Sequence, residues 1–144
     1  MIVVDLNVLL YAHDESDPRH VASARWLREA AAAGSEGIGL ALTTALGFIR
    51  ITTDPRVYEV PRTIADAIGI VEAWFAHPNV RLIAPTERHW EVLRRLADGA
   101  RARGPLVMDA HVAALALEHG AAVASADRDF RRFDGVRVID PTAA

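Results

Sequence analysis

The first eleven residues, MIVVDLNVLLY (residues 1–11), decide how the rest of the chain is interpreted. Residues 2–4 are a short β-branched run, which predicts a strand buried on both faces. Asp5 ends this run, and apolar residues resume at Val8 with no turn signal between, which indicates a helix that starts directly off the strand. A carboxylate at the carboxyl end of a buried parallel strand lies where open α/β sheets bind ligands. The alternative is that Asp5 only caps the helix, by accepting backbone N–H bonds in its first turn.

The size and composition of the chain are those of a folded globular protein. Its 144 residues predict one domain over residues 1–144, and 51% are hydrophobic against 24% charged. The absence of cysteine excludes disulfides and thiolate zinc sites, and it fits a reducing cytosol. The N-terminus has no basic leader, and no apolar stretch approaches the ~18–20 residues of a membrane span. We therefore expect a cytoplasmic protein without a membrane segment.

All sixteen basic residues are arginine, which excludes several classes of protein that bind ligands at strand ends. Two-component receiver domains and haloacid-dehalogenase-type phosphatases both need a lysine in the site. A dinucleotide-binding domain would need G-x-G-x-x-G after the first strand, and this motif is missing.

The net charge of −3 argues against a strong non-specific nucleic-acid binder. A nuclease with an acidic metal site can still carry such a charge, because bound cations offset the carboxylates.

Strand and helix patterns alternate along the chain. Apolar strands are predicted at residues 2–4, 38–42, 80–84, 121–125 and 136–139, with helical patterns between nearly all of them. This alternation predicts an α/β fold, a three-layer α/β/α sandwich with a central, mostly parallel sheet of about five strands.

The helices are predicted from their apolar periodicity and caps. Asp17 and Pro18 are typical of an N-cap and first helical residue for a helix that ends near residue 33. Thr43 or Thr44 begins the next helix. Thr63 with Asp66 resembles a capping box. The helix that follows has an apolar stripe that we expect to be buried, made of Ile64, Ala67, Ile68, Val71, Trp74 and Phe75. Further helices are predicted from about residue 86 and over residues 107–118.

Aspartates recur where strands and helices meet. Asp5 follows the first strand, and Asp127 follows the fourth, with Asp129 two residues later. Asp109 lies in the first turn of the 107–118 helix, where the helix dipole favours an anion. Because the carboxyl ends of parallel strands face one edge of a sheet, these carboxylates can converge there.

Converging carboxylates indicate a metal site, because like charges at close range cannot all stay ionised unless a cation joins them. Mg²⁺ prefers oxygen ligands and keeps several waters. Such an ion can lower the pKa of a bound water and neutralise charge that grows on a phosphodiester. The pattern therefore favours metal-assisted phosphodiester hydrolysis. The alternative is that each aspartate is an independent helix cap.

The chain also resembles a known family. The stretches MIVVDLNVLLYA (1–12), ALGFIRITTDPRVY (45–58), VMDAHVAALALEHGA (107–121) and SADRDF (125–130) are similar, in this order, to the PIN-domain ribonucleases, specifically the VapC toxins of type II toxin–antitoxin systems. The resemblance implies a Mg²⁺- or Mn²⁺-dependent endoribonuclease acting on transfer or ribosomal RNA. It also implies a homodimer that a small cognate antitoxin inhibits. By the same resemblance, Asp5, Asp109 and Asp127 would be the catalytic metal ligands, and Asn7 and Ser125 would orient them.

One position departs from the family pattern. VapC toxins usually carry a glutamate just before the Phe-(Ile/Leu)-Arg of the second stretch, and here that position is Gly47. Asp129 is the nearest acid that can compensate. The alternative function is therefore a catalytically impaired PIN-fold protein that binds RNA or a partner.

Several other side chains have two interpretations. Arg50, Arg101, Arg103 and Arg128 are candidates for contacts with RNA phosphates, or for a solvated surface. His111 is two residues past Asp109 and would point about 200° away around the helix, so we expect a structural role for it. The helices at residues 22–51 and 64–75 carry many apolar positions, which a hydrophobic groove for an antitoxin helix or core packing would explain.

Overall fold

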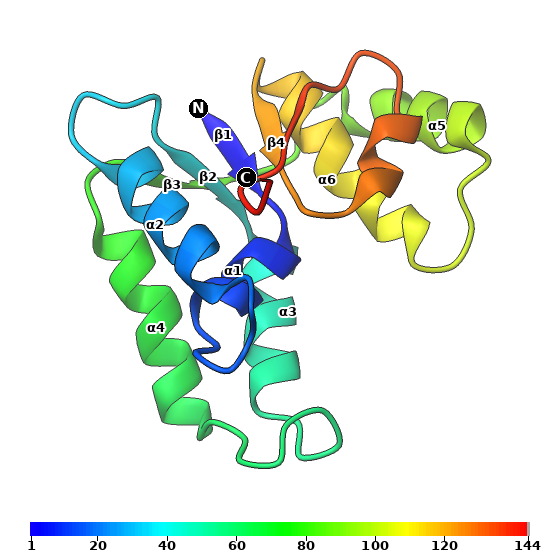
Figure 1. Cartoon of the computed structure of the whole chain (residues 1–144). Helices are drawn as coiled ribbons and strands as arrows, with labels where there is room; N and C mark the ends of the chain where they lie inside the picture. Colours follow the sequence, from blue (N-terminus) through cyan, green and yellow to red (C-terminus); the bar gives the residue numbers. More distant parts are fainter. Residues whose placement is uncertain (144) are drawn as a thin grey trace.

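Five short parallel strands form the centre of this computed structural model, which describes residues 1–143 (Figure 1). They are β1 (Ile2–Val4), β2 (Ile38–Ala41), β3 (Val80–Ile83), β4 (Ala122–Ala124) and β5 (Val138–Ile139), in the spatial order β3-β2-β1-β4-β5. All four pairings are parallel, so the carboxyl ends of the strands lie at one edge of the sheet. The predicted fold class is confirmed.

Helices cover both faces of the sheet and complete the three layers (Figure 1). They are α1 (Leu6–Ala12), α2 (His20–Ala31), α3 (Leu42–Thr52), α4 (Ile64–Ala76), α5 (His89–Ala100) and α6 (Leu106–Glu118), with a short 3₁₀ helix, η1 (Arg128–Arg132). Val3 packs into the core beneath α5 and α6, whereas its neighbour Val4 packs into the core beneath α1–α4. Successive side chains of β1 thus point to opposite faces and are fully buried on both, as the β-branched run predicts.

The strand-to-helix junctions are tight, and this tightness positions the site. α1 begins at Leu6, two residues after β1 ends, and α3 begins at Leu42, directly after β2. Side chains at the start of α1 and α3 therefore lie close to the carboxyl edge of the sheet. α6 is buried along most of its length, and its alanines let it pack closely between the sheet and α5.

The predicted start of one helix is wrong, and the predicted cap of another is confirmed. α2 begins at His20 rather than at Pro18, because the Asp17 carboxylate binds both the backbone N–H and the guanidinium of Arg19. In α4, Thr63 does accept the predicted bond from the Asp66 N–H, at 3.1 Å.

The apolar stripe expected to be buried on α4 is only partly buried. Ile64 is 58% exposed and Ile68 39%, and Ala67 is fully buried. Within residues 1–143, no helix is both long and apolar enough to cross a membrane.

Candidate active site

Asp5 lies at the junction of β1 and α1 and is 8% exposed. Its Oδ1 accepts the Leu6 N–H at 2.8 Å, which caps α1. Its Oδ2 accepts a hydrogen bond from the Ser125 hydroxyl, also at 2.8 Å. Burial raises the pKa of Asp5, while these two bonds act in the opposite direction. Asp5 therefore caps its helix and also presents its second oxygen to the end of β4.

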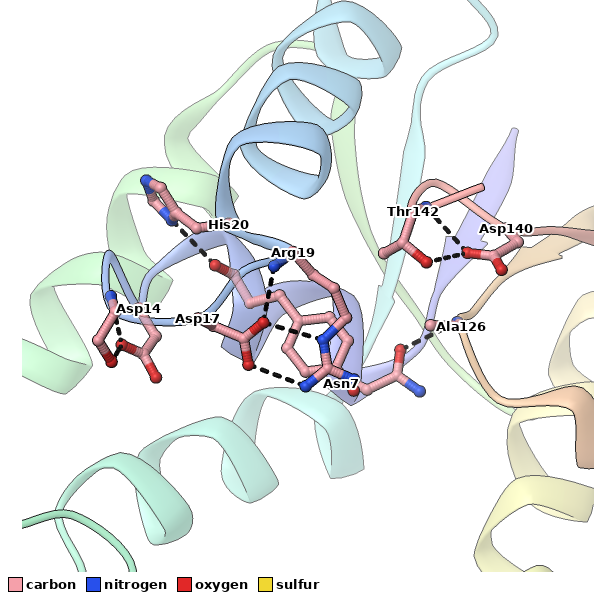
Figure 2. Close-up of polar contacts among 10 residues, drawn as sticks. Asn7, Asp14, Asp17, Arg19, His20, Ala126, Asp140 and Thr142 are labelled. Atoms are coloured by element: carbon pink, nitrogen blue, oxygen red, sulfur yellow. Dashed lines mark hydrogen bonds and ion pairs between the residues drawn. The ribbon is translucent and has the colours of Figure 1, made fainter. Parts of the chain in front are cut away.

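Ser125, just past β4, is the centre of this arrangement. It is 1% exposed, and its hydroxyl oxygen accepts the Asp127 N–H at 3.0 Å and the Asn7 amide at 3.2 Å. The Asn7 side-chain oxygen accepts the Ala126 N–H at 3.3 Å, and Figure 2 shows the amide facing that backbone group. Ser125 and Asn7 thus hold the end of β4 against the start of α1, with Asp5 between them.

Asp127 and Asp129 form the next turn of the chain. The Asp127 Oδ1 accepts the Asp129 N–H at 2.9 Å and thereby caps η1. Asp127 is half-buried, and Asp129 is exposed. One Asp127 oxygen is therefore occupied by the cap, and the other has no protein donor among the described residues.

Asp109, in the first turn of α6, has a strongly raised pKa. Burial and then the negative charges of Asp5, Asp127 and Asp129 raise its pKa to about 7. No arginine or histidine of residues 1–143 acts on this pKa in the opposite direction. The side chain is only half-buried, so it remains open to a ligand. The charges of Asp5, Asp127 and Asp129 thus all act on Asp109.

The donors fit a hard divalent cation better than any other metal, because carboxylates are the ligands such ions prefer. The carboxylates do not form a preformed metal cage. Within the described 143 residues, no three acidic or histidine side chains lie close enough together to hold one ion. Mg²⁺ does not need such a cage, since it is commonly held by one or two carboxylates, substrate phosphates and water. That Asp5, Asp109 and Asp127 share one ion stays a prediction.

Gly47 has a structural explanation. It is buried on α3, and a Cβ at this position would lie 2.8 Å from the Leu6 Cδ2. The Leu6 side chain thus fills the space into which a side chain at position 47 would extend. This contact joins α1 and α3, and no local pattern in the sequence could have revealed it.

The candidate arginines lie in different places. Arg50 is exposed on α3, eight residues after the helix begins, and its charge acts on Asp54 at the far end. Arg128 is exposed beside Asp127. Arg101 and Arg103 line a cavity of about 620 Å³ together with Asp129. Of the four candidate arginines, Arg101, Arg103 and Arg128 therefore lie near the aspartates, and Arg50 does not.

A polar chain that sequence reasoning missed runs between three helices. His111 on α6 hydrogen-bonds through Nδ1 to His89 Nε2 at 2.9 Å and through Nε2 to Thr43 Oγ1 at 3.1 Å. His89 Nδ1 in turn binds Glu118, whose side chain is 1% exposed and also accepts two bonds from Thr86. His111 is thus structural, as expected. Its partners are too far apart in sequence for any spacing rule to connect them.

The chain is similar to known proteins over nearly its whole length. The family model of the PIN domain matches residues 2–136. The chain is 41% identical over 143 residues to Ribonuclease VapC37 of Mycobacterium tuberculosis, covering 99% of both chains. It is 43% identical over 141 residues to Ribonuclease VapC25 of the same organism, covering 98% of this chain and 99% of the relative.

Solved structures share the fold at lower sequence identity. VapBC-1 from nontypeable Haemophilus influenzae matches with a TM-score of 0.71 and 17% identity, covering 99% of this chain and 100% of that chain. VapC20 of M. tuberculosis, described as a sarcin-ricin loop cleaving toxin, matches with a TM-score of 0.63 and 21% identity, covering 95% and 99%. Because a PIN-domain match spans nearly all of the sequence and its relatives are similar from end to end, the chain belongs to the PIN-domain family, within the group of VapC ribonucleases.

Proposed function

We propose that this protein is a Mg²⁺- or Mn²⁺-dependent endoribonuclease and the toxic component of a toxin–antitoxin pair. The observation that supports this most directly is the uncompensated charge at Asp109. Its pKa of about 7 results from burial and from three neighbouring aspartates. A divalent cation would remove this conflict, and the donors around it are the oxygens that Mg²⁺ prefers.

The residues of the chain have separate roles in this proposal. Asp5, Asp109 and Asp127 would hold the ion, with Asp129 as a further acid. When bound, the ion would activate water and neutralise charge on the phosphodiester. The bonds from Ser125 and the Leu6 N–H oppose the rise in the pKa of Asp5 that burial causes, and they fix the direction of its carboxylate. Asn7 holds the end of β4 in place, so Asp127 keeps its position relative to Asp5.

The substrate and partners are inferred from the relatives and from the surface. The relatives are named ribonucleases, and one structural match is described as cutting the sarcin-ricin loop, so we infer an RNA substrate, transfer or ribosomal. Structural matches are toxin–antitoxin complexes, which supports a small antitoxin partner. Exposed apolar side chains on α2 and α4 (Val21, Ile64 and Ile68) offer a surface for it, and those on α3 (Leu42 and Leu46) offer one for a homodimer.

A second candidate function is binding of RNA or a partner without catalysis. The contact between Gly47 and Leu6 favours it, because α3 contributes no acid to the site. The absence of a preformed three-residue cluster in residues 1–143 favours it as well.

One experiment separates the two functions. Purified protein is incubated with total RNA in MgCl₂, in MnCl₂ and in EDTA, alongside the Asp5→Asn and Asp109→Asn variants. We expect cleavage that requires the metal and falls at least about 100-fold in either variant. Asp134→Asn, an exposed acid outside the site, is the matched control and should cut normally. Calorimetric titration of Mn²⁺ provides a readout that does not depend on activity: binding without cleavage would favour the second candidate, and no binding would remove the metal site.

A further inference from the structure

A cavity of about 620 Å³ opens beside Asp129, and three of the six residues that line it are arginines. Its walls are Arg101, Arg103, Pro105 and Leu106 from the α5–α6 connection, and Asp129 and Arg132 from η1. In Figure 1 the α5–α6 connection (yellow-green to yellow) and η1 (orange) lie on the same side of the sheet as α6. Three arginines against one aspartate give the cavity a net positive charge within a chain whose formal charge is −3.

Asp129 connects this cavity to the candidate active site. Its carboxylate lines the cavity, and its charge contributes to the raised pKa of Asp109. A polyanion that crosses the aspartates would therefore reach the arginines without leaving the surface. The cavity is large enough for part of a nucleotide, and guanidinium groups bind phosphate through paired hydrogen bonds.

Arg101 is held in a conformation that arginine rarely adopts. It is the C-cap of α5, with φ +51° and ψ +48°, and it has the only positive φ of a non-glycine residue in the described part of the chain. Glycine is the usual residue at the end of a helix in this left-handed conformation, because it has no Cβ to clash. Backbone strain of this kind is found mainly at functional positions. An arginine at this position is less favourable for folding than a glycine. Its presence therefore indicates that the guanidinium group binds a ligand.

Arg132 is fixed from the other side of the cavity. Its Nη2 donates to the Ala100 carbonyl at the end of α5, 2.5 Å away. This bond ties η1 to the α5–α6 connection and leaves the other N–H groups of the guanidinium available. The site is therefore partly organised before any ligand binds.

We propose that this arginine cavity binds a backbone phosphate of the RNA strand adjacent to the phosphate that the aspartates act on. The inference rests on the proposed function for its substrate class. Arg101 and Arg103 supply the main contacts, and Arg132 holds the cavity in shape.

The test measures binding of a fluorescein-labelled 12-nucleotide single-stranded RNA by anisotropy, in EDTA so that no cleavage occurs. The Arg101→Gln/Arg103→Gln double variant should bind about tenfold more weakly at 100 mM salt. The slope of log K against log salt should fall by about 1.4, since each phosphate contact on a single strand contributes about 0.7. Arg94→Gln/Arg95→Gln is the matched control on the same helix: both side chains are exposed and neither lines the cavity. Equal slopes in the two double variants would overturn the proposal.

Arg101→Gly gives a second and sharper test, because binding and stability should change in opposite directions. Relief of the left-handed strain should raise Tm by about 3 °C, while RNA affinity falls several-fold. A purely structural arginine would lose stability without a specific change in the salt slope. A rise in Tm with unchanged RNA affinity would contradict the proposed role of Arg101.

Other outcomes distinguish this inference from the proposed catalysis. If RNA binding depends on the arginines but the protein cuts no RNA in MgCl₂, the role of the cavity in RNA binding is supported and the proposed catalysis is wrong. Normal RNA binding by the double variant, together with weakened binding of an acidic antitoxin segment, would assign the cavity to a protein ligand and overturn the RNA proposal.

Discussion

The Ser125 hydroxyl donates to Asp5 Oδ2 at 2.8 Å and so joins the end of β4 to the end of β1. The same oxygen accepts the Asp127 N–H, so one small side chain sets the spacing between two of the aspartates. Ser125 is buried, and so is the Asp5 carboxylate that it binds.

Ser125→Ala should therefore weaken the site more than it weakens the fold. We expect Mn²⁺ affinity or cleavage to fall about 10–100-fold, as is typical when a residue that orients a metal ligand is removed. The free energy of unfolding should fall by only about 1–3 kcal/mol. Calorimetric titration and urea denaturation measure the two effects.

The chain provides a close control for this substitution. The Ser16 hydroxyl donates to Asp14 Oδ1 at 2.6 Å in an exposed turn, which is the same chemical pair in water. Ser16→Ala should leave metal affinity and stability unchanged within about 0.5 kcal/mol. If both serine variants behaved alike, Ser125 would have no special relation to the site.

Asp109→Asn should stabilise the metal-free protein at pH 8. The native pKa of Asp109, about 7, lies above its ordinary value of 3.8, so between these pH values the native state holds a proton that the unfolded state has lost. Stability should therefore fall as pH rises from about 4 to 7 and stay level above 7. The neutral asparagine escapes this loss.

The gain should be about 1 kcal/mol, less than the pKa alone suggests, because water screens a half-exposed carboxylate. Urea denaturation in EDTA at pH 4.5 and pH 8 measures it, with Asp134→Asn as the control. The difference between Asp109→Asn and wild type should shrink towards zero at the lower pH. If the variant were less stable than wild type at pH 8, the neighbouring aspartates would not destabilise the ionised form of Asp109.

The fold was predictable from sequence because its signals are local. The β-branched run at residues 2–4 and the missing turn before Val8 predict β1 and α1, and both are present. The capping bond at Thr63 was predictable for the same reason. The start of α2 was not, since Asp17 has two possible partners and the guanidinium of Arg19 decides between them.

The site was predictable only as a set of positions. Strand ends place Asp5 and Asp127 at one edge, and the family resemblance names Ser125, but the hydrogen bonds by which Ser125 joins Asp5 and Asp127 are seen only in the fold. The exposure of Ile64 and Ile68 likewise depends on which side of α4 packs against the rest of the protein. Helical periodicity does not specify that side. Contacts between distant segments are what the local patterns leave out.

The contact between Gly47 and Leu6 predicts a coupled pair of substitutions. Gly47→Glu should destabilise the protein by about 1–3 kcal/mol, because the new Cβ would overlap the Leu6 Cδ2. In a Leu6→Ala background the same change should cost about 1–2 kcal/mol less, since the space is then free. Urea denaturation of the four proteins in the double-mutant cycle measures the coupling. Additive effects would show that Leu6 does not occupy the space beside position 47.

The polar chain around the buried side chain of Glu118 should contribute to stability without affecting the proposed metal site. Glu118 accepts bonds from Thr86 and His89, and although burial raises its pKa, these bonds hold the pKa below its ordinary value. Glu118→Ala would leave both donors without a partner and should cost about 2–4 kcal/mol. Glu87→Ala, at an exposed position nearby, is the control. Equal stability of the two variants would show that the chain of hydrogen bonds is not formed.

His13 should make the protein sensitive to acid. Burial, and then the charges of Arg62 and His20, lower its pKa from 6.5 to about 4, and its Nε2 accepts the Trp74 indole N–H at 2.9 Å. Between pH 6.5 and 4 the unfolded state therefore binds a proton that the native state refuses, so stability falls as the pH falls.

The loss across this window should be about 2 kcal/mol, after allowance for partial exposure of the ring. His13→Gln keeps an acceptor for Trp74 but cannot titrate, so its stability should depend less on pH by that amount. The comparison is made between the two proteins at each pH, because Asp109 acts in the opposite direction over part of the same range and cancels from the difference. Parallel curves for wild type and His13→Gln would place the titrating group elsewhere, and the hydrogen bond from Trp74 would then be too weak to keep the imidazole neutral.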